Sequence, residues 1–125
     1  MSLVLDSGAL IGIERRDPRL LADLLVAQRR AIPVVTSAGV VAQVWRDGAG
    51  QAHLARHLKG IDQRSINPAA AREVGTLLGV TRTTDIVDAH VSLIAGNGDV
   101  VRTSDPGDIE RLLAARNSRA VVVGL

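Results

Sequence analysis

The sequence has 125 residues and a mass of 13.1 kDa; 46% of the residues are hydrophobic, none is cysteine, and Trp45 is the only aromatic residue. This length suits one domain with a single core, and the absence of cysteine excludes disulfide bonds, thiolate metal ligands and thiol nucleophiles. The formal net charge is only +2, yet the pI is about 10.4 because every Lys or Arg position except Lys59 is an arginine. Arginine pairs well with phosphate, but the lack of Phe and Tyr argues against a protein that stacks single-stranded bases on aromatic side chains.

The N-terminus does not resemble a targeting segment. It lacks a basic stretch followed by a long apolar one, and no apolar run approaches the ~18 residues of a membrane span. We therefore expect a soluble, cytoplasmic protein without a membrane segment, in which residues 1–125 form one domain.

The first residues predict a strand, a turn and a helix. Leu3 to Leu5 is a wholly apolar run, typical of a strand buried on both faces. Asp6 follows it, and the next two residues can turn the chain into the apolar helical stretch from Ala9 to Ile13. In open α/β sheets, ligands bind beyond the carboxyl ends of the strands, so Asp6 is a candidate site residue. Its alternative role is to cap the helix through its side-chain oxygen.

Helical and extended patterns then alternate up to the middle of the chain. Asp17 and Pro18 are a typical helix start, and the glycines at 48 and 50 suit a helix end. The patterns predict a helix from Pro18 to Arg30 and a strand from Pro33 to Thr36. A helix then starts at Thr36 and Ser37, runs through Trp45 and ends at Gly48 and Gly50, and a shorter helix follows from Gln51 to Lys59.

Two histidines lie one turn apart on the helix expected at 51–59. His53 and His57 could bind a metal on one helix face. No third ligand is apparent near them in the sequence, and exposed helix histidines are common, so a surface role is the alternative.

The second half of the chain continues the alternation. It predicts a polar edge strand from Ile61 to Ile66, a helix from Ala69 to Leu78 that closes at Gly79, a helix from Asp85 to Ile94, a strand from Asp99 to Thr103, a helix from Asp105 to Ala115 and a last strand from Ala120 to Val123. Strands that alternate with helices indicate a parallel sheet covered on both faces. We therefore expect an α/β domain with four to five parallel strands.

Two acid pairs, Asp85 with Asp88 and Asp105 with Asp108, begin helices. Taken singly, each pair resembles a capping arrangement, and negative charge suits the positive end of the helix dipole. In a parallel sheet, however, the strand ends that carry Asp6 and Asp105 face the same side. Carboxylates gathered there repel one another unless a cation neutralises them. Oxygen ligands without cysteine favour Mg²⁺ or Mn²⁺, which act on phosphoryl groups.

Three stretches together resemble the acidic motifs of PIN domains, and of the small VapC-type toxins in particular. They read LVLDSGALI at 3–11, DIVDAHV at 85–91 and VVRTSDPGDI at 100–109. The resemblance implies a three-layer fold with a central parallel sheet, a divalent-metal-dependent ribonuclease, homodimerisation and a cognate antitoxin. It also assigns metal-binding acids: Asp6, Asp88 and Asp105, with Asp108 as an additional or substitute ligand. Asp85 is expected to cap its helix.

The chain departs from that pattern at one position. Relatives usually carry a glutamate in the stretch that reads VVAQVWRDG here, where this chain has Gln43. Glutamine offers a carbonyl oxygen but no charge, so metal affinity should fall. Glu14, one helix along from Asp6, could assist, or it could pair with nearby arginines.

These observations leave two hypotheses. The first is a metal-dependent endoribonuclease toxin in which arginines, with Arg46 and Arg82 as candidates, contact the RNA backbone. The second is a degenerate domain that binds RNA or a protein partner without cleavage because of Gln43. A nucleotide-binding or phosphoacceptor domain is disfavoured, because no glycine-rich phosphate loop follows the first strand and Lys59 is the only lysine.

Overall fold

The computed structural model describes all residues from Met1 to Leu125. Its centre is a sheet of five parallel strands in the order β3-β2-β1-β4-β5. The strands are β1 (Leu3–Leu5), β2 (Val34–Ser37), β3 (Asp62–Arg64), β4 (Val100–Thr103) and β5 (Val121–Gly124). The expected parallel α/β architecture is confirmed, and the first strand of the chain is the central one.

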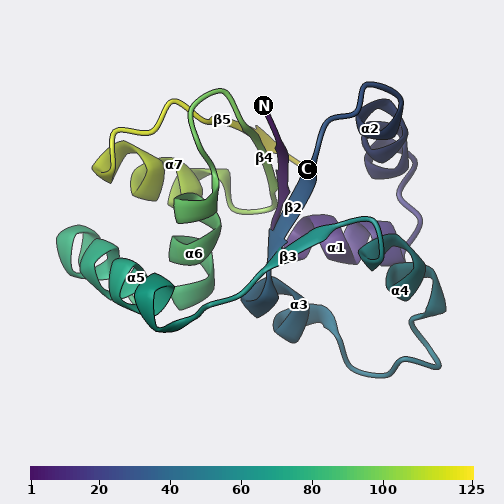
Figure 1. The fold of residues 1–125 in the computed structure, drawn as a ribbon, viewed down its shortest axis with the longest axis horizontal. Coiled ribbons are helices and arrows are strands. Elements are labelled where there is room, and N and C mark those ends of the chain that lie inside the picture. The colour runs from purple at the N-terminus through teal and green to yellow at the C-terminus, as the bar shows by residue number, and fades with distance from the viewer.

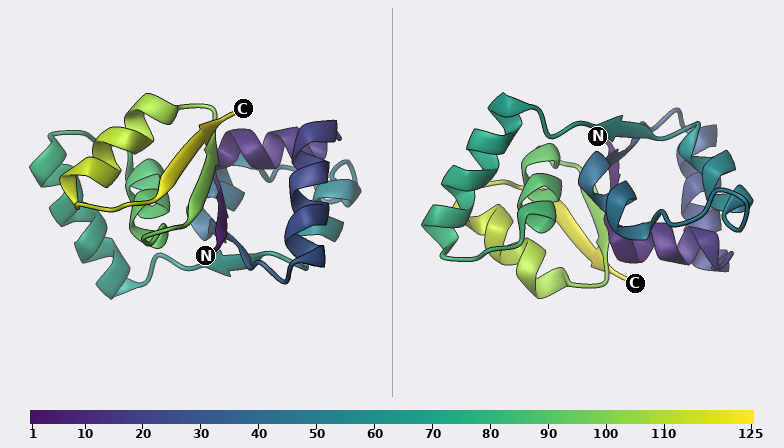
Figure 2. Two further views of the ribbon diagram at one scale, coloured as in Figure 1. Left: turned by 90° about the horizontal axis from the view of Figure 1, so that it is seen from above. Right: turned by 90° about the horizontal axis from the view of Figure 1, so that it is seen from below.

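Seven helices cover the sheet. They are α1 (Ser7–Glu14), α2 (Pro18–Arg29), α3 (Ala38–Val44), α4 (Ala52–Leu58), α5 (Pro68–Thr81), α6 (Ile86–Ile94) and α7 (Pro106–Ala115). Figures 1 and 2 show α1, α2 and α4 on one face of the sheet and α5, α6 and α7 on the other, with α3 between the two groups. None of these helices has the length and apolar character needed to cross a membrane.

The core explains why β1 is central. Leu3, Val4 and Leu5 are all buried, and they pack with the apolar face of α1, which buries Leu10 and Ile13. A strand covered on both faces needs apolar side chains throughout. A second, smaller cluster of buried hydrophobic residues joins α5, α6 and α7. It contains Val74, Leu77, Ala89 and Leu112.

Most element boundaries differ from the sequence-based expectation by one residue at most, and three elements differ by more. The helix after β2 ends at Val44 rather than at Gly48 and Gly50, and the polar edge strand is shortened to Asp62–Arg64, where every residue is exposed. The helix expected to close at Gly79 continues to Thr81 and ends at Arg82, which has a left-handed φ of 55°. Gly79 lies on an exposed side of α5 with open space around it, and the helix passes through it to a cap at Arg82, whose backbone N–H donates to the carbonyl group of Leu78.

Gly8 lets the start of α1 approach the loop after β4. A Cβ atom at this position would lie 2.6 Å from Ser104 Oγ and 2.9 Å from Leu125 Cδ1. No larger residue fits without displacement, so Gly8 keeps Asp6 close to the loop that carries Asp105.

We expect Gly8→Ala to destabilise the fold by roughly 1–3 kcal/mol, because the added methyl group overpacks this contact. Urea denaturation followed by circular dichroism measures the free energy of unfolding. The matched control is Gly79→Ala, which should stabilise by about 0.5–1 kcal/mol because alanine favours an exposed helix interior. Equal effects of the two substitutions would contradict the close approach at Gly8.

Candidate active site

Asp6 is buried at the junction of β1 and α1, with an exposed fraction of 2%. As the N-cap of α1, it accepts a hydrogen bond at Oδ1 from the backbone N–H of Ala9, at 3.4 Å. Its Oδ2 accepts a hydrogen bond from the hydroxyl group of Thr103. Asp6 therefore does cap α1, and the same carboxylate is also hydrogen-bonded to the neighbouring strand β4.

Thr103, the fully buried last residue of β4, connects two candidate acids. Its Oγ1 donates to Asp6 and accepts a hydrogen bond from the backbone N–H of Asp105, at 2.9 Å. This hydroxyl group fixes both the Asp6 carboxylate and the start of the following loop. Thr103 is not predicted as a site residue from the sequence, where its only signal is a threonine at the end of a strand, two residues before an acid.

At the start of α6, Asp85 caps the helix as expected, whereas the side chain of Asp88 does not. The side chain of Asp85 accepts a hydrogen bond from the backbone N–H of Asp88, at 2.9 Å, and so caps the helix. Asp88 is partly buried in the first turn, and its carboxylate forms no hydrogen bond to a protein group. It is therefore free to bind a ligand.

The acids at the start of α7 do not form the expected cap. Asp105 occupies the N-cap position, but its side chain makes no capping hydrogen bond and is exposed. Asp108 lies in the first turn and is also exposed. Because neither acid is needed to satisfy the helix end through its side chain, the structural explanation is weaker here than at Asp85.

The acids act on one another electrostatically. Burial, followed by the charges of Asp85, Asp6, Asp105 and Asp108, raises the pKa of Asp88 to about 6. Burial also raises the pKa of Asp6, with a further contribution from the charge of Asp105, while its hydrogen bonds oppose the shift. The two salt bridges in the molecule, Arg64 with Asp62 and Arg102 with Asp23, involve none of these acids. The cluster therefore has no ion-paired cation.

A cavity of about 280 Å³ opens beside this cluster. Its lining residues are Thr83, Thr84, Asp85, Asp88, Asp108, Arg111 and Leu112. Arg111 is the one cationic side chain in the lining, and the sequence analysis did not single it out. The cavity thus combines carboxylates with a guanidinium group, which can pair with a phosphate.

The candidate acids have the ligand atoms that a hard divalent cation prefers, but their side chains are not arranged to coordinate one together. All candidate ligands are carboxylate oxygens, the type that Mg²⁺ and Mn²⁺ prefer, and they repel one another without a cation. No three His, Asp or Glu side chains form a group that could hold a metal ion as they stand. Simultaneous ligation would require side-chain rotation, for which the exposed and uncapped Asp105 is free.

The other residues named from the sequence lie elsewhere. Gln43 is exposed in the last turn of α3 and makes no hydrogen bond, and Glu14 lies at the far end of α1, about 12 Å along its axis from Asp6. The guanidinium group of Arg46 donates to the carbonyl groups of Ala42 and Trp45, while Arg82 ends α5. None of them lines the cavity beside Asp88.

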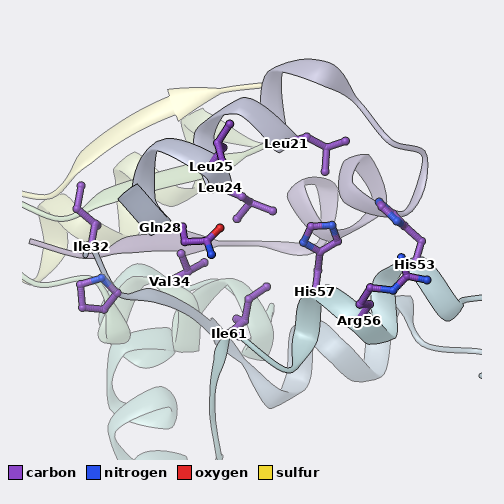
Figure 3. Close-up of a pocket in the computed structure, with 12 residues that line it drawn as sticks. Leu21, Leu24, Leu25, Gln28, Ile32, Val34, His53, Arg56, His57 and Ile61 are labelled. Atoms are coloured by element: carbon purple, nitrogen blue, oxygen red, sulfur yellow. The ribbon is translucent and has the colours of Figure 1, made fainter. Parts of the chain in front are cut away.

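A second, larger feature is a groove of about 630 Å³ between α2 and α4. Figure 3 shows leucines of α2 on one side and histidines of α4 on the other. The lining residues are Leu21, Leu24, Leu25, Gln28, Ile32, Pro33, Val34, His53, Arg56, His57, Gly60 and Ile61. They are apolar, basic or neutral, and none is acidic. Burial, with smaller effects of His53 and Arg56, lowers the pKa of His57.

Neither a family model nor a curated protein matches the sequence. Among solved structures, the fold is similar to a chain in the crystal structure of VapBC2 from Rickettsia felis bound to a DNA fragment from their promoter. The superposition has a TM-score of 0.72 and covers 100% of this chain and 99% of that chain, at 11% sequence identity. At this identity the likeness establishes the fold alone, and at that level the expected PIN-like fold is confirmed.

The raised pKa of Asp88 predicts that stability falls as the pH rises from about 4 to about 6. In this window the folded chain keeps a proton that the unfolded chain has already released, so raising the pH favours unfolding. We expect Asp88→Asn, which cannot ionise, to flatten the dependence of Tm on pH and to raise Tm at neutral pH.

Thermal denaturation across this pH range, without added metal, measures the effect. Asp62→Asn is the control, because Asp62 is exposed and paired with Arg64, away from the cluster. A profile for Asp88→Asn that runs parallel to that of the wild type would contradict the electrostatic strain at Asp88.

Proposed function

We propose that the chain is a divalent-metal-dependent endoribonuclease and the toxin of a toxin–antitoxin pair. The observation that carries the proposal is the electrostatic repulsion that Asp88 receives from Asp6 and Asp105, which belong to two other segments, without an ion-paired cation among the three acids. Mutually repelling carboxylates lower the stability of the chain, and a cation-dependent function gives a physical reason for their presence.

In this proposal the acids bind the metal ion and Thr103 positions one of them. Asp6, Asp88 and Asp105 would hold Mg²⁺ or Mn²⁺, with Asp108 as a further ligand. Such an ion supplies charge stabilisation at a phosphoryl group and activation of water. Thr103 holds the Asp6 carboxylate in place through its hydroxyl group, so this ligand is oriented before the substrate arrives.

The surroundings of the cluster suit a phosphodiester substrate. Arg111 lines the cavity that contains Asp88 and Asp108 and forms no salt bridge with them. It could therefore pair with a backbone phosphate next to the one that is cleaved. Hydrolysis adds water at phosphorus and breaks one P–O ester bond, which yields a phosphate end and a sugar hydroxyl group.

The groove between α2 and α4 is the surface at which we propose that the antitoxin binds. Its leucines offer apolar contact area, and its polar rim carries Arg56 with two histidines and no acid. A segment of the antitoxin with apolar and acidic side chains would complement it. Homodimerisation, which the resemblance implies, is also part of the proposal, and analytical ultracentrifugation of the purified chain tests it.

We expect Asp6→Asn to abolish metal-dependent RNA cleavage. Asparagine keeps the capping role, so the fold should persist, but the charge that holds the ion is lost. A loss of several kcal/mol in transition-state stabilisation corresponds to about 100-fold or more in rate. The assay incubates a structured RNA with Mg²⁺, Mn²⁺ or EDTA, with Asp62→Asn as the control that should cleave like the wild type. Cleavage by Asp6→Asn at the wild-type rate would refute the assignment.

Gln43→Glu tests the alternative of a binding domain without cleavage. If position 43 belongs to the metal site, the added carboxylate should raise cleavage by about tenfold or more, as one extra charged ligand strengthens metal binding. Gln28→Glu, in the groove and away from the acids, is the matched control and should leave the rate unchanged. An unchanged rate for Gln43→Glu would exclude position 43 from the chemistry. If cleavage occurs only with Gln43→Glu, the wild-type chain is a binding domain.

A further inference from the structure

The groove contains a histidine pair that the proposed ribonuclease activity does not use. His53 and His57 lie four residues apart on α4, so they share one face of the helix. Their ring centroids are 4.7 Å apart and the ring planes meet at 73°. Figure 3 shows the two imidazoles next to each other in the groove, with Leu21 and Leu24 from α2 above them.

One ring nitrogen of this pair is both buried and without a hydrogen-bond partner. His53 Nε2 is buried and forms no hydrogen bond. A buried polar atom without a partner costs free energy, and a bound water or ion is a usual explanation. The third histidine shows the contrast, because His90 Nδ1 lies 2.6 Å from Ser37 Oγ in a buried hydrogen bond. The unsatisfied nitrogen is therefore a feature of the pair and not of every histidine in the chain.

We propose that His53 and His57 form a binding site for a divalent transition-metal ion of the Zn²⁺ class. Neutral imidazole is a preferred ligand of Zn²⁺, and two histidines four residues apart on a helix present both rings to one ion. The ion would give the unpartnered His53 nitrogen a ligand role. It differs from the hard cation proposed for the carboxylates, because imidazole suits Zn²⁺ whereas carboxylate oxygen suits Mg²⁺ and Mn²⁺.

The surroundings define what kind of site this is. No third His, Asp or Glu lies close enough to complete it, so the remaining coordination positions face the groove and are filled by solvent in the isolated chain. The exposed Arg56 lies on the same helix and lines the same groove, and its charge weakens cation binding. The site is thus a two-histidine site of moderate affinity, open to further ligands.

Isothermal titration calorimetry of Zn²⁺ into tag-free protein tests the proposal. An Asp6→Asn, Asp88→Asn background removes two of the four proposed ligands of the carboxylate cluster, and competition with excess Mg²⁺ reports Zn²⁺ held by the remaining acids, so the result does not depend on the proposed function. We expect one Zn²⁺ per chain, without competition from excess Mg²⁺. His53→Asn and His57→Asn should each weaken binding on the order of 100-fold, because two linked ligands reinforce each other through effective concentration.

Arg56→Gln is the matched control on the same helix, and it should bind Zn²⁺ as tightly or more tightly because a nearby positive charge is removed. Nitrogen-15 spectra of the imidazole rings provide a second readout, in which Zn²⁺ should shift the ring signals of His53 and His57 but not those of His90. Absence of binding, or equal affinity in the wild-type pair and in both histidine variants, would overturn the proposal.

Discussion

Several acids at one edge of the sheet repel one another, and this repulsion is the main electrostatic strain in the molecule. Burial places Asp6 where its charge is costly, and only the hydroxyl group of Thr103 and backbone N–H groups stabilise that charge. The negative charges of four other acids raise the pKa of Asp88, and no arginine forms a salt bridge with any of these acids. A fold selected for stability alone would replace these side chains, and this is the physical basis on which we propose a cation and a phosphate ligand for the cluster.

The topology of the sheet brings these acids together. β1 is central, with β2 and β4 as its neighbours, and all strands run in the same direction. Asp6 follows β1 and Asp105 follows β4, so both acids lie at the same edge, where α/β folds bind ligands. Thr103 then connects the two strand ends, and Gly8 allows the close approach that this connection requires.

Much of this arrangement could be predicted from local sequence, and its failures have physical causes. The apolar run from Leu3 to Leu5 predicts a buried strand, and the spacing of Asp85 and Asp88 predicts a helix N-cap. These two features can be predicted because each depends only on residues that are close in the sequence. The bond from Thr103 to Asp6 spans 97 positions, so no local pattern shows it. α5 continues past Gly79 to a C-cap at Arg82, whose backbone N–H donates to the carbonyl group of Leu78; an isolated glycine near the end of a helical pattern does not by itself fix where the helix ends.

Binding of Mn²⁺ is the direct test of the proposed carboxylate site. Electron paramagnetic resonance of Mn²⁺ titrated into the chain distinguishes free from bound ion, and Mg²⁺ should compete because both prefer oxygen ligands. Our account predicts that Asp6→Asn and Asp88→Asn each weaken binding by at least about tenfold, whereas Asp62→Asn does not, since each cluster acid contributes directly to the ion's stabilisation. Equal Mn²⁺ affinity in all four proteins, or no binding by the wild type, would contradict it.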